Sequence, residues 1–341
     1  MLLWLRAMHR AVFITLLLST VALPLMSLTG GAELHAKDLE KISFIPQWEP
    51  QAQFAGYYVA YEKGLYKAQG LEVTMLRGGP GKPSAGMLAG GGADFATMFL
   101  STGIQERARG APLINIAQVM RRSGFLLITR KSSGIDTPRD MEGKKIGLWG
   151  AELRLQPTAF LKKYDVHVKI VPQCYTINLF LRGGVDIASA MLYNEYHTVL
   201  NAGVNPEDLV VFSLADYGIN FPEDGLYCLE KTYKQNPATC CRFVLASLQG
   251  WKYAFEHPEE ALDIVMKYVN EANIATNRQH QKWMLDHMRE LIYPSDTITP
   301  AGELSESDYT AVARELKAGG LIDGIPSFSD FFVNCVRADE K

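Results

Sequence analysis

The sequence predicts an α/β protein of two lobes, in which each lobe is a sheet flanked by helices and a hinge joins the lobes. Strand and helix patterns alternate over residues 41–130, a second alternating series runs over residues 137–214, and the chain is almost purely helical from Lys231. The 341 residues, 48% of them hydrophobic, suffice for two domains of ordinary size. We assign residues 37–127 and 226–341 to the first lobe and residues 128–225 to the second.

The first series begins with a strand at "KISFIP" and a helix that starts near Phe54. In this helix apolar residues recur at steps of three and four, and the following "LEVTML" alternates as a strand with one buried face does. Such a βαβ unit implies a parallel pair with a right-handed crossover. The series continues with a helix at 83–89, a strand at 93–97, a helix ending at 109, and strands at 113–119 and 125–130.

The second series opens with a short helix in which Thr137 is the expected N-cap, Pro138 the first helical residue and Gly143 the end. Strands are expected at 144–149, 167–171, 185–191 and 208–214, and helices at 152–164, 177–181 and 195–201. Crossings near residues 125–130 and 220–227 are expected to form the hinge. Amphipathic helices at 241–256 and 258–269 then return to complete the first lobe.

The N-terminus has the pattern of a secretory signal peptide over residues 1–36. Arg6 and Arg10 precede an apolar run at 11–26, and small residues follow, with Ala36 or Ala32 as the cleavage position. The alternative is a membrane anchor, but Pro24 interrupts the run, which is shorter than the roughly 20 residues that span a bilayer. The sequence therefore predicts an exported, periplasmic protein.

Charge and cysteine content limit the classes of function. The net charge of −3 provides no basic surface for nucleic acid. The five cysteines leave at least one free thiol, adjacent Cys240 and Cys241 cannot easily bridge one another, and most are expected to be small buried hydrophobes. No pair has the spacing of a zinc site, and no catalytic triad or paired-carboxylate pattern occurs. We expect no metal and no cofactor.

Five segments occur in an order that resembles a known family: "QWEPQAQFAGYYVAYEKGLYKAQGLEV", "LAGGGADFA", "DMEGKKIG", "GGVDIASAMLYNEY" and "NPATCCRFVLASLQGWKYAFEHPEEA". Together they resemble the periplasmic solute-binding proteins of ABC importers for sulfonates, nitrate and pyrimidine precursors of thiamine, from Ile42 to about Asp323. The resemblance implies the type II periplasmic binding protein fold. It also implies a monomer that takes a small solute to a permease and its ATPase, without catalysis.

One branch of this superfamily is an enzyme, the synthase that makes the thiamine pyrimidine from its own histidine and pyridoxal phosphate. On the segment "ADFATMFLST" the cofactor lysine of that synthase falls on Met98 and its sacrificial histidine on Thr102. The cysteine-rich motif falls near "GINFPED", which contains no cysteine. A Schiff base requires an amine, so the resemblance argues against the enzyme here and leaves it as the alternative.

Ligand contacts are expected where strands end, because open α/β sheets bind ligands at their carboxyl edges. Gln53, Phe54, Tyr57 and Tyr58 cannot all face one way on a helix; Gln53 and Phe54 are favoured for the cleft, Tyr58 and Tyr61 for the core. The complete set of predicted ligand contacts is Trp48, Gln53, Phe54, Tyr57, Thr97, Met98, Ser101, Trp149, Tyr193, Asn194, Glu195 and Tyr217. Each also has a structural explanation, as a packed ring or a helix cap.

The mixture of rings, amides and carboxylates suits a planar N-heterocycle, such as a thiamine-type pyrimidine or a flavin. Stacking that buries roughly 150 Å² contributes about 4 kcal/mol, half of what micromolar binding needs, so hydrogen bonds from both lobes must supply the rest. A sulfonate or nitrate ligand is the alternative, with Arg77, Arg121 and Arg122 as cations. The glycine-rich segment 77–84 does not match a Walker A loop, since Leu76 and Pro83 stand at required positions.

Overall fold

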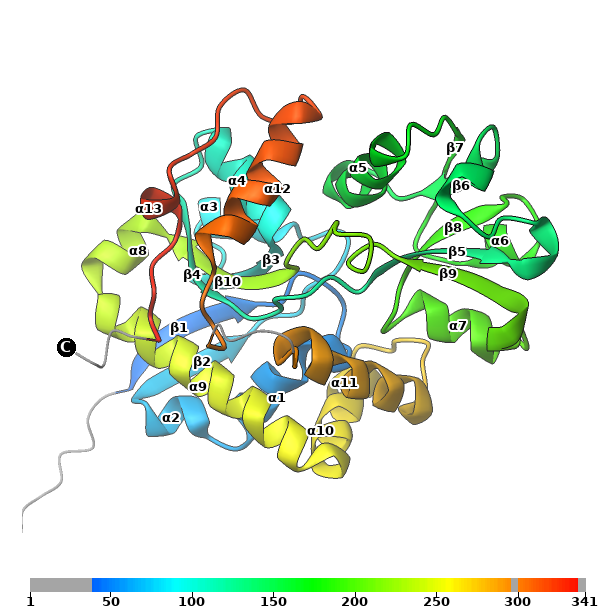
Figure 1. Ribbon diagram of the computed structural model, residues 1–341. Helices are drawn as coiled ribbons and strands as arrows, with labels where there is room; N and C mark the ends of the chain where they lie inside the picture. The colour runs from blue at the N-terminus through cyan, green and yellow to red at the C-terminus, as the bar shows by residue number, and fades with distance from the viewer. Residues whose placement is uncertain (1–38, 296–299, 337–341) are drawn as a thin grey trace, which may run out of the picture. The chain divides into compact units, whose positions relative to one another are not determined.

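The computed structural model describes residues 39–295 and 300–336, and over these ranges the chain forms two five-stranded sheets with helices packed around them (Figure 1). The α/β architecture predicted from the alternating pattern is confirmed. The predicted signal peptide, residues 1–36, lies outside the described residues. Within the described ranges, no helix combines the length and the apolar character needed to cross a membrane.

The first sheet is parallel except for one strand. Its strands lie in the order β2 (Leu71–Met75), β1 (Glu40–Ile45), β3 (Phe95–Phe99), β10 (Asp224–Leu229) and β4 (Leu113–Gln118). Strand β1 pairs in parallel with β2 and β3, whereas β10 is antiparallel to both β3 and β4. Because Asp224 pairs with Phe99, the start of β10 lies at the carboxyl edge of the parallel strands.

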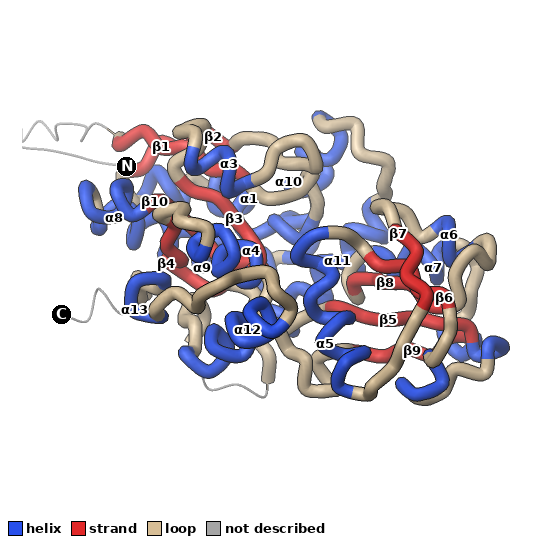
Figure 2. Tube along the Cα trace, turned by 90° about the horizontal axis from the view of Figure 1, so that it is seen from above, coloured by secondary structure: helices blue, strands red, loops and turns tan. Residues whose placement is uncertain are grey.

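The second sheet has the same organisation. Its strands lie in the order β7 (Lys169–Pro172), β6 (Lys145–Leu148), β8 (Ile187–Met191), β5 (Phe125–Arg130) and β9 (Leu209–Ser213). Strand β6 pairs in parallel with β7 and β8, and β5 is antiparallel to β8 and β9. Figure 2 shows the two groups of strands and the helices that flank them.

The chain passes between the sheets at places that differ from the expected crossings. Residues 125–130, expected both as a strand and as a crossing, are strand β5 inside the second sheet, and residues 224–229 are strand β10 inside the first. Strand β10 was not predicted, because all six of its residues are buried and it therefore has no alternating pattern. The crossings therefore precede Phe125 and Asp224, while the predicted lobe boundaries stay a prediction.

The helices follow the predicted series closely. They are α1 (Ala55–Glu62), α2 (Leu65–Ala68), α3 (Ser84–Ala89), α4 (Leu100–Ala108), α5 (Leu155–Lys163), α6 (Asn178–Leu181), α7 (Glu195–Asn201), α8 (Glu230–Gln235), α9 (Pro237–Glu256), α10 (Pro258–Glu271), α11 (Arg278–Ile292), α12 (Glu306–Ala318) and α13 (Phe328–Phe331). A 3-10 turn over Ala52–Phe54 leads into α1. Thr137 and Asp140 form the expected capping arrangement before the short turn Pro138–Met141.

Helices α1 and α9 pack closely because glycines stand at their contact. A Cβ atom added to Gly56 would lie 2.3 Å from the ring of Trp251, and one added to Gly250 would lie 2.1 Å from the carbonyl oxygen of Gly56. Trp251 in turn meets the Tyr57 ring edge-on, with 5.7 Å between centroids. The rings of α1 are therefore partly explained by packing against α9.

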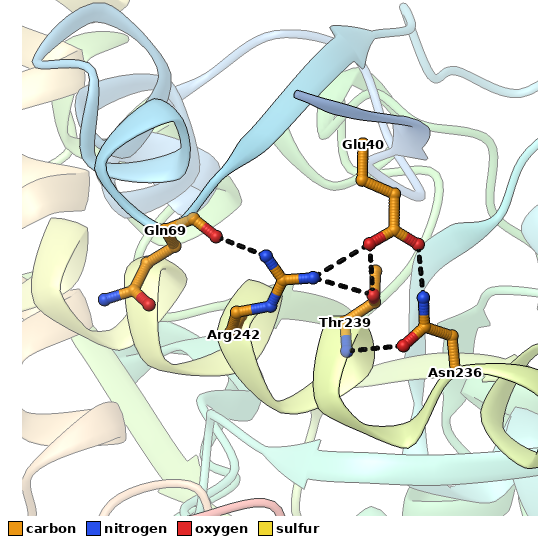
Figure 3. Close-up of polar contacts among 5 residues, drawn as sticks. All are labelled: Glu40, Gln69, Asn236, Thr239 and Arg242. Atoms are coloured by element: carbon orange, nitrogen blue, oxygen red, sulfur yellow. Dashed lines mark hydrogen bonds and ion pairs between the residues drawn. The ribbon is translucent and has the colours of Figure 1, made fainter. Parts of the chain in front are cut away.

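A polar cluster fastens the amino ends of β1 and β2 to α9 (Figure 3). Glu40, the first residue of β1, accepts hydrogen bonds from the side chains of Asn236, Thr239 and Arg242 at 2.6, 2.5 and 2.8 Å. Arg242 also donates to the carbonyl oxygen of Gln69 at 2.6 Å, just before β2. These hydrogen bonds link the amino edge of the first sheet to the first turns of α9.

One disulfide joins α9 to the C-terminal segment: Cys241 and Cys335 are bridged, with a Cα–Cα distance of 4.7 Å. The expectation that Cys240 and Cys241 do not bridge each other, and that a thiol is left free, is confirmed. The expectation that most cysteines are plain buried hydrophobes holds for Cys228 and Cys240, whereas Cys174 is exposed. No local spacing could reveal the bridge, since 94 residues separate its partners.

Candidate functional site

A cavity of about 390 Å³ opens where the carboxyl ends of strands from both sheets come together. This volume lies in the range of roughly 300–1,000 Å³ that is typical of small-molecule sites. Its lining residues are Gln47, Trp48, Gln51, Gln53, Gly79, Pro80, Pro83, Ser84, Ala85, Met98, Phe99, Thr102, Glu106, Trp149, Leu153, Tyr175, Met191, Tyr193, Asn194 and Glu195. We call this space the inter-sheet cavity.

The wall from the first sheet begins directly after β1. The backbone N–H of Gln47 donates to Thr97 Oγ1 at 2.8 Å, and its side-chain amide donates to Asp224 Oδ1 at 2.6 Å. Gln53, in the turn before α1, donates to Asp224 Oδ2 at 2.9 Å and accepts from the amide of Gln51 at 2.6 Å. Asp224 therefore holds two glutamines in place beside Trp48.

The rest of that wall comes from the end of β3, from α4 and from the glycine-rich loop before α3. Met98 and Phe99 end β3, and Thr102 follows one turn later on α4. The loop passes tightly against the first strand, since a Cβ on Gly78 would lie 1.9 Å from the carbonyl oxygen of Pro46. Only glycine permits this approach, which brings Gly79 and Pro80 to the cavity.

The wall from the second sheet begins after β6 and β8. Trp149 follows β6, and its indole N–H donates to the carbonyl oxygen of Cys174 at 3.2 Å. Tyr193 follows β8, and its hydroxyl donates to Glu223 Oε2 at 2.9 Å. Glu195 starts α7 and accepts from the backbone N–H of Met191 and from the amide of Asn194, both at 2.9 Å.

Three buried carboxyl groups dominate the electrostatics. Burial raises the pKa of Glu223 to about 8, and the neighbouring charge of Asp224 adds to the increase. Burial likewise raises the pKa of Asp224 and of Glu195 to about 7 each. At neutral pH such a group exists in both protonation states, so the Glu195 carboxyl can accept a hydrogen bond or donate one. Glu195 lines the cavity, whereas Glu223 and Asp224 lie behind the side chains that they hold.

The cavity lining contains no lysine and no arginine. The three arginines considered for a cationic site have other partners: Arg77 pairs with Glu49 at 2.9 Å, Arg122 pairs with Asp216 at 2.7 Å, and Arg121 donates to the carbonyl oxygen of Ile292 at 3.0 Å. Over residues 39–295 and 300–336, no group of three or more His, Cys, Asp or Glu side chains is placed to hold a metal ion.

The structure brings seven of the twelve predicted contacts to the inter-sheet cavity, and their role as ligand contacts stays a prediction. They are Trp48, Gln53, Met98, Trp149, Tyr193, Asn194 and Glu195.

The other five predicted contacts lie elsewhere. Phe54, Tyr57 and Thr97 are each at most 1% exposed; Tyr57 packs against Phe44, and Thr97 accepts from Gln47. Ser101 lines a separate space of about 20 Å³. Tyr217 packs edge-on against Phe160, with 5.2 Å between ring centroids. Tyr58 is buried as expected, whereas Tyr61, expected in the core, is 40% exposed. Residues 55–60 are buried all round, so periodicity could not distinguish core from cleft.

Several lining residues were not predicted. Gln47 is adjacent to Trp48 at the end of β1, so the strand-end rule could have identified it. Tyr175 follows β7, an edge strand of the second sheet, and no local pattern marks it. A second cavity of about 460 Å³ lies against β2 and α10, but every residue that lines it belongs to or flanks the first sheet, among them Glu62 and Lys267. No residue of the second sheet therefore contributes to this second cavity.

A family model described as NMT1/THI5 like matches residues 51–261 of this chain. The riboflavin-binding protein of Chloroflexus aurantiacus is 24% identical over 97% of this chain and 97% of its own length. The formylaminopyrimidine-binding protein of Halalkalibacterium halodurans is 24% identical over 69% of this chain and 72% of its own length. The 4-amino-5-hydroxymethyl-2-methylpyrimidine phosphate synthase of Schizosaccharomyces pombe is 24% identical over 64% of this chain and 61% of its own length.

Two solved structures confirm the fold. The periplasmic sulfonate-binding protein of Methylobacillus flagellatus superposes with a TM-score of 0.66 at 17% identity, over 87% of this chain and 92% of its own. A Candida albicans protein, described as having the generic periplasmic binding protein fold, superposes with a TM-score of 0.57 at 14% identity. The superposition covers 87% of this chain and 96% of that protein. The predicted periplasmic binding protein fold is therefore correct.

Proposed function

This chain belongs to the NMT1/THI5-like family, and we propose that it is the solute-binding component of an ABC importer. In this proposal a small planar N-heterocycle, a thiamine-type pyrimidine or a flavin, binds in the inter-sheet cavity and is carried to a permease. The relatives that bind riboflavin and formylaminopyrimidine support this class of ligand.

The observation that carries the proposal is the composition of the inter-sheet cavity. Five aromatic rings line it, those of Trp48, Phe99, Trp149, Tyr175 and Tyr193, and amide or carboxyl groups stand beside them on both walls. Rings supply flat apolar contact, while Gln53, Asn194 and Glu195 supply donors and acceptors for the edges of a heterocycle. Each wall alone offers part of this set, so tight binding requires both.

Charge separates the proposed ligands from the sulfonate alternative. The cavity has Glu195 and Glu106 but no cationic side chain in its lining. A sulfonate or nitrate would bring its negative charge next to the buried Glu195 carboxyl group, with no cation in the lining to compensate it, which costs several kcal/mol. A neutral heterocycle meets no such cost, and one with an amino group gives Glu195 a donor.

We propose that the protein does not catalyse pyrimidine synthesis. Met98 lines the cavity at the end of β3, and Thr102 lines it on α4. These are the positions at which the resemblance places the lysine and histidine of the synthase. Neither side chain can form a Schiff base or supply an imidazole.

Export and delivery complete the proposal. The signal pattern of residues 1–36 supports a periplasmic location, and the resemblance to periplasmic solute-binding proteins supports a monomer that carries its solute to a permease. The disulfide between Cys241 and Cys335 is consistent with an oxidising compartment.

A thermal-shift panel tests the proposal. The purified protein is heated with riboflavin, formylaminopyrimidine, an alkanesulfonate and nitrate in turn. We expect a raised melting temperature with at least one heterocycle and none with the anions, because a ligand stabilises the state that binds it. Stabilisation by the sulfonate alone would overturn the choice of ligand. Absorbance of bound pyridoxal phosphate and turnover that requires iron would instead establish the synthase.

A further inference from the structure

Tyr175 is the most exposed large hydrophobic side chain in the described part of the chain, at 61%. It lies between β7 and α6, lines the inter-sheet cavity, and its ring contacts the ring of Trp48 with centroids 4.7 Å apart and planes tilted by 59°. Because Trp48 follows β1, this contact reaches from a loop of the second sheet to a loop of the first.

The backbone on each side of this contact is held in place. Before Tyr175, the side chain of Gln173 donates to the carbonyl oxygen of Ser189 at 2.7 Å and accepts from its N–H at 3.2 Å. The Trp149 indole donates to the carbonyl oxygen of Cys174. On the other side, Gln47 is held by Thr97 and Asp224. Two anchored loops therefore present their rings to one another.

The contact between Trp48 and Tyr175 buries only part of the Tyr175 side chain. Aromatic pairs are favourable at centroid distances of about 4.5–7 Å, but most of the Tyr175 ring stays in water. A flat guest that lies against Trp48 needs the volume that Tyr175 now occupies, since two rings with 4.7 Å between centroids leave no layer between them. Rotation of the Tyr175 side chain about its χ angles removes this obstruction without moving the anchored backbone.

We infer that Tyr175 is a ligand-contacting residue, the movable wall of an aromatic clamp whose other wall is Trp48. A planar solute displaces the Trp48–Tyr175 contact, stacks on Trp48, and is then covered by the Tyr175 ring. The assignment rests on the proposed function, because it requires a flat ligand in the inter-sheet cavity. It deepens that function by naming the group that selects flat rings and delays their release.

The clamp predicts which rate constant depends on Tyr175. The ring covers a bound solute, so removing it opens an exit and chiefly accelerates dissociation. Loss of one stacking contact corresponds to a change of about tenfold in the dissociation rate. The hydroxyl group takes no part, so phenylalanine should replace tyrosine.

The experiment compares the purified protein with its Tyr175→Ala and Tyr175→Phe variants, using stopped-flow titration with riboflavin and with formylaminopyrimidine as probes. We expect dissociation to be about tenfold faster in Tyr175→Ala and within about twofold of the unmodified rate in Tyr175→Phe. Tyr61→Ala is the matched control, because Tyr61 is also an exposed tyrosine, at 40%, but lies on α1 outside the inter-sheet cavity. Melting temperatures of all variants should agree.

The outcomes separate the two hypotheses. If a probe binds and Tyr175→Ala releases it at the unmodified rate, the clamp is wrong and the proposed function stands. If Tyr175→Phe fails to restore slow release, the hydroxyl rather than the ring acts, which also overturns the clamp. If neither probe binds the unmodified protein, the proposed function fails and the clamp fails with it.

Discussion

Two carboxylate clusters stand at opposite edges of the first sheet and are built differently. At the amino edge, Glu40 accepts from Arg242, Thr239 and Asn236, and its side chain is 35% exposed (Figure 3). At the cavity edge, Glu223 and Asp224 are at most 3% exposed and accept only from neutral donors, such as Tyr193 and Gln53. The first cluster includes a cation and is partly exposed to solvent, whereas the carboxyl groups of the second are buried among the neutral donors described.

This difference in exposure and charge indicates that the Glu40 cluster stabilises the fold, whereas the Glu223–Asp224 cluster positions cavity residues. Glu40 joins a strand to a helix at a charge-neutral, partly hydrated contact, which stabilises the fold modestly. Glu223 and Asp224 sit next to each other without a counter-charge, and burial raises the pKa of both. These two carboxyl groups accept hydrogen bonds from residues of both cavity walls. Gln47 and Gln53 donate from the wall of the first sheet, and Tyr193 donates from the wall of the second. An unfavourable pair of buried carboxyl groups therefore lies directly behind residues that line the inter-sheet cavity.

The largest effect is expected from Glu223→Ala. It removes the acceptor for the Tyr193 hydroxyl and for the Gly124 N–H, bonded at 2.9 and 2.7 Å, and leaves both donors buried without a partner. We expect unfolding free energy to fall by about 3 kcal/mol, measured by urea denaturation. Glu223→Gln keeps the shape and one acceptor, so its loss should be about 1 kcal/mol. Equal losses in the two variants would show that shape, not hydrogen bonding, matters at this position.

The same cluster predicts how stability depends on pH. The folded pKa values of Glu223 and Asp224, about 8 and about 7, lie above their ordinary values of 4.5 and 3.8. The folded state therefore binds their protons more tightly, so this contribution is fully present below about pH 4 and is lost as pH rises towards 8.

Denaturation curves between pH 5 and pH 8 test the sign. Stability should fall more steeply with rising pH in the unmodified protein than in Glu223→Gln, which cannot ionise at that position. His280 acts in the opposite direction, because burial lowers its pKa from 6.5 to about 4. Its contribution to stability is therefore lost as pH falls from 6.5 towards 4. Because it is common to both proteins, the difference between their curves isolates Glu223. Parallel curves would contradict the raised pKa.

The smallest effect is expected at the amino edge. Glu40→Ala removes three side-chain partners, but Arg242 is 28% exposed and can be hydrated in place. We expect a loss of about 1 kcal/mol at low salt, and a smaller one at roughly 1 M salt, where charge interactions are screened within about 3 Å. Lys252→Ala, which breaks an exposed pair with Glu256 on α9, serves as the surface control. A Glu40→Ala loss that equals that of Glu223→Ala would remove the distinction between the clusters.

Local patterns in the sequence predicted most of the fold. Half-buried strands such as β2 alternate clearly, and α7 begins and ends where its pattern predicts. Strand β10 is fully buried and enters its sheet from a distant part of the chain, so neither periodicity nor neighbouring elements reveal it.

The candidate site divides in the same way. Trp48, Trp149 and Tyr193 were identified because they follow strands, and the carboxyl edge of a sheet is a local property of chain order. Phe54 and Tyr57 lie outside the cavity lining; residues 51–60 are all buried, so periodicity could not distinguish core from cleft there. Tyr175 was missed because its significance depends on the loop of the other sheet that it meets. Contacts between distant segments are decided by tertiary packing, which one sequence does not display.

The central claim is that a flat, uncharged heterocycle binds between the two sheets with contacts from both walls. A crystal structure of the protein grown with riboflavin or formylaminopyrimidine tests it most directly. We predict ligand density in the inter-sheet cavity, against Trp48 and within hydrogen-bonding distance of Glu195. Density in the cavity beside β2 and α10 instead, or a ligand that touches residues of only one sheet, would contradict the account.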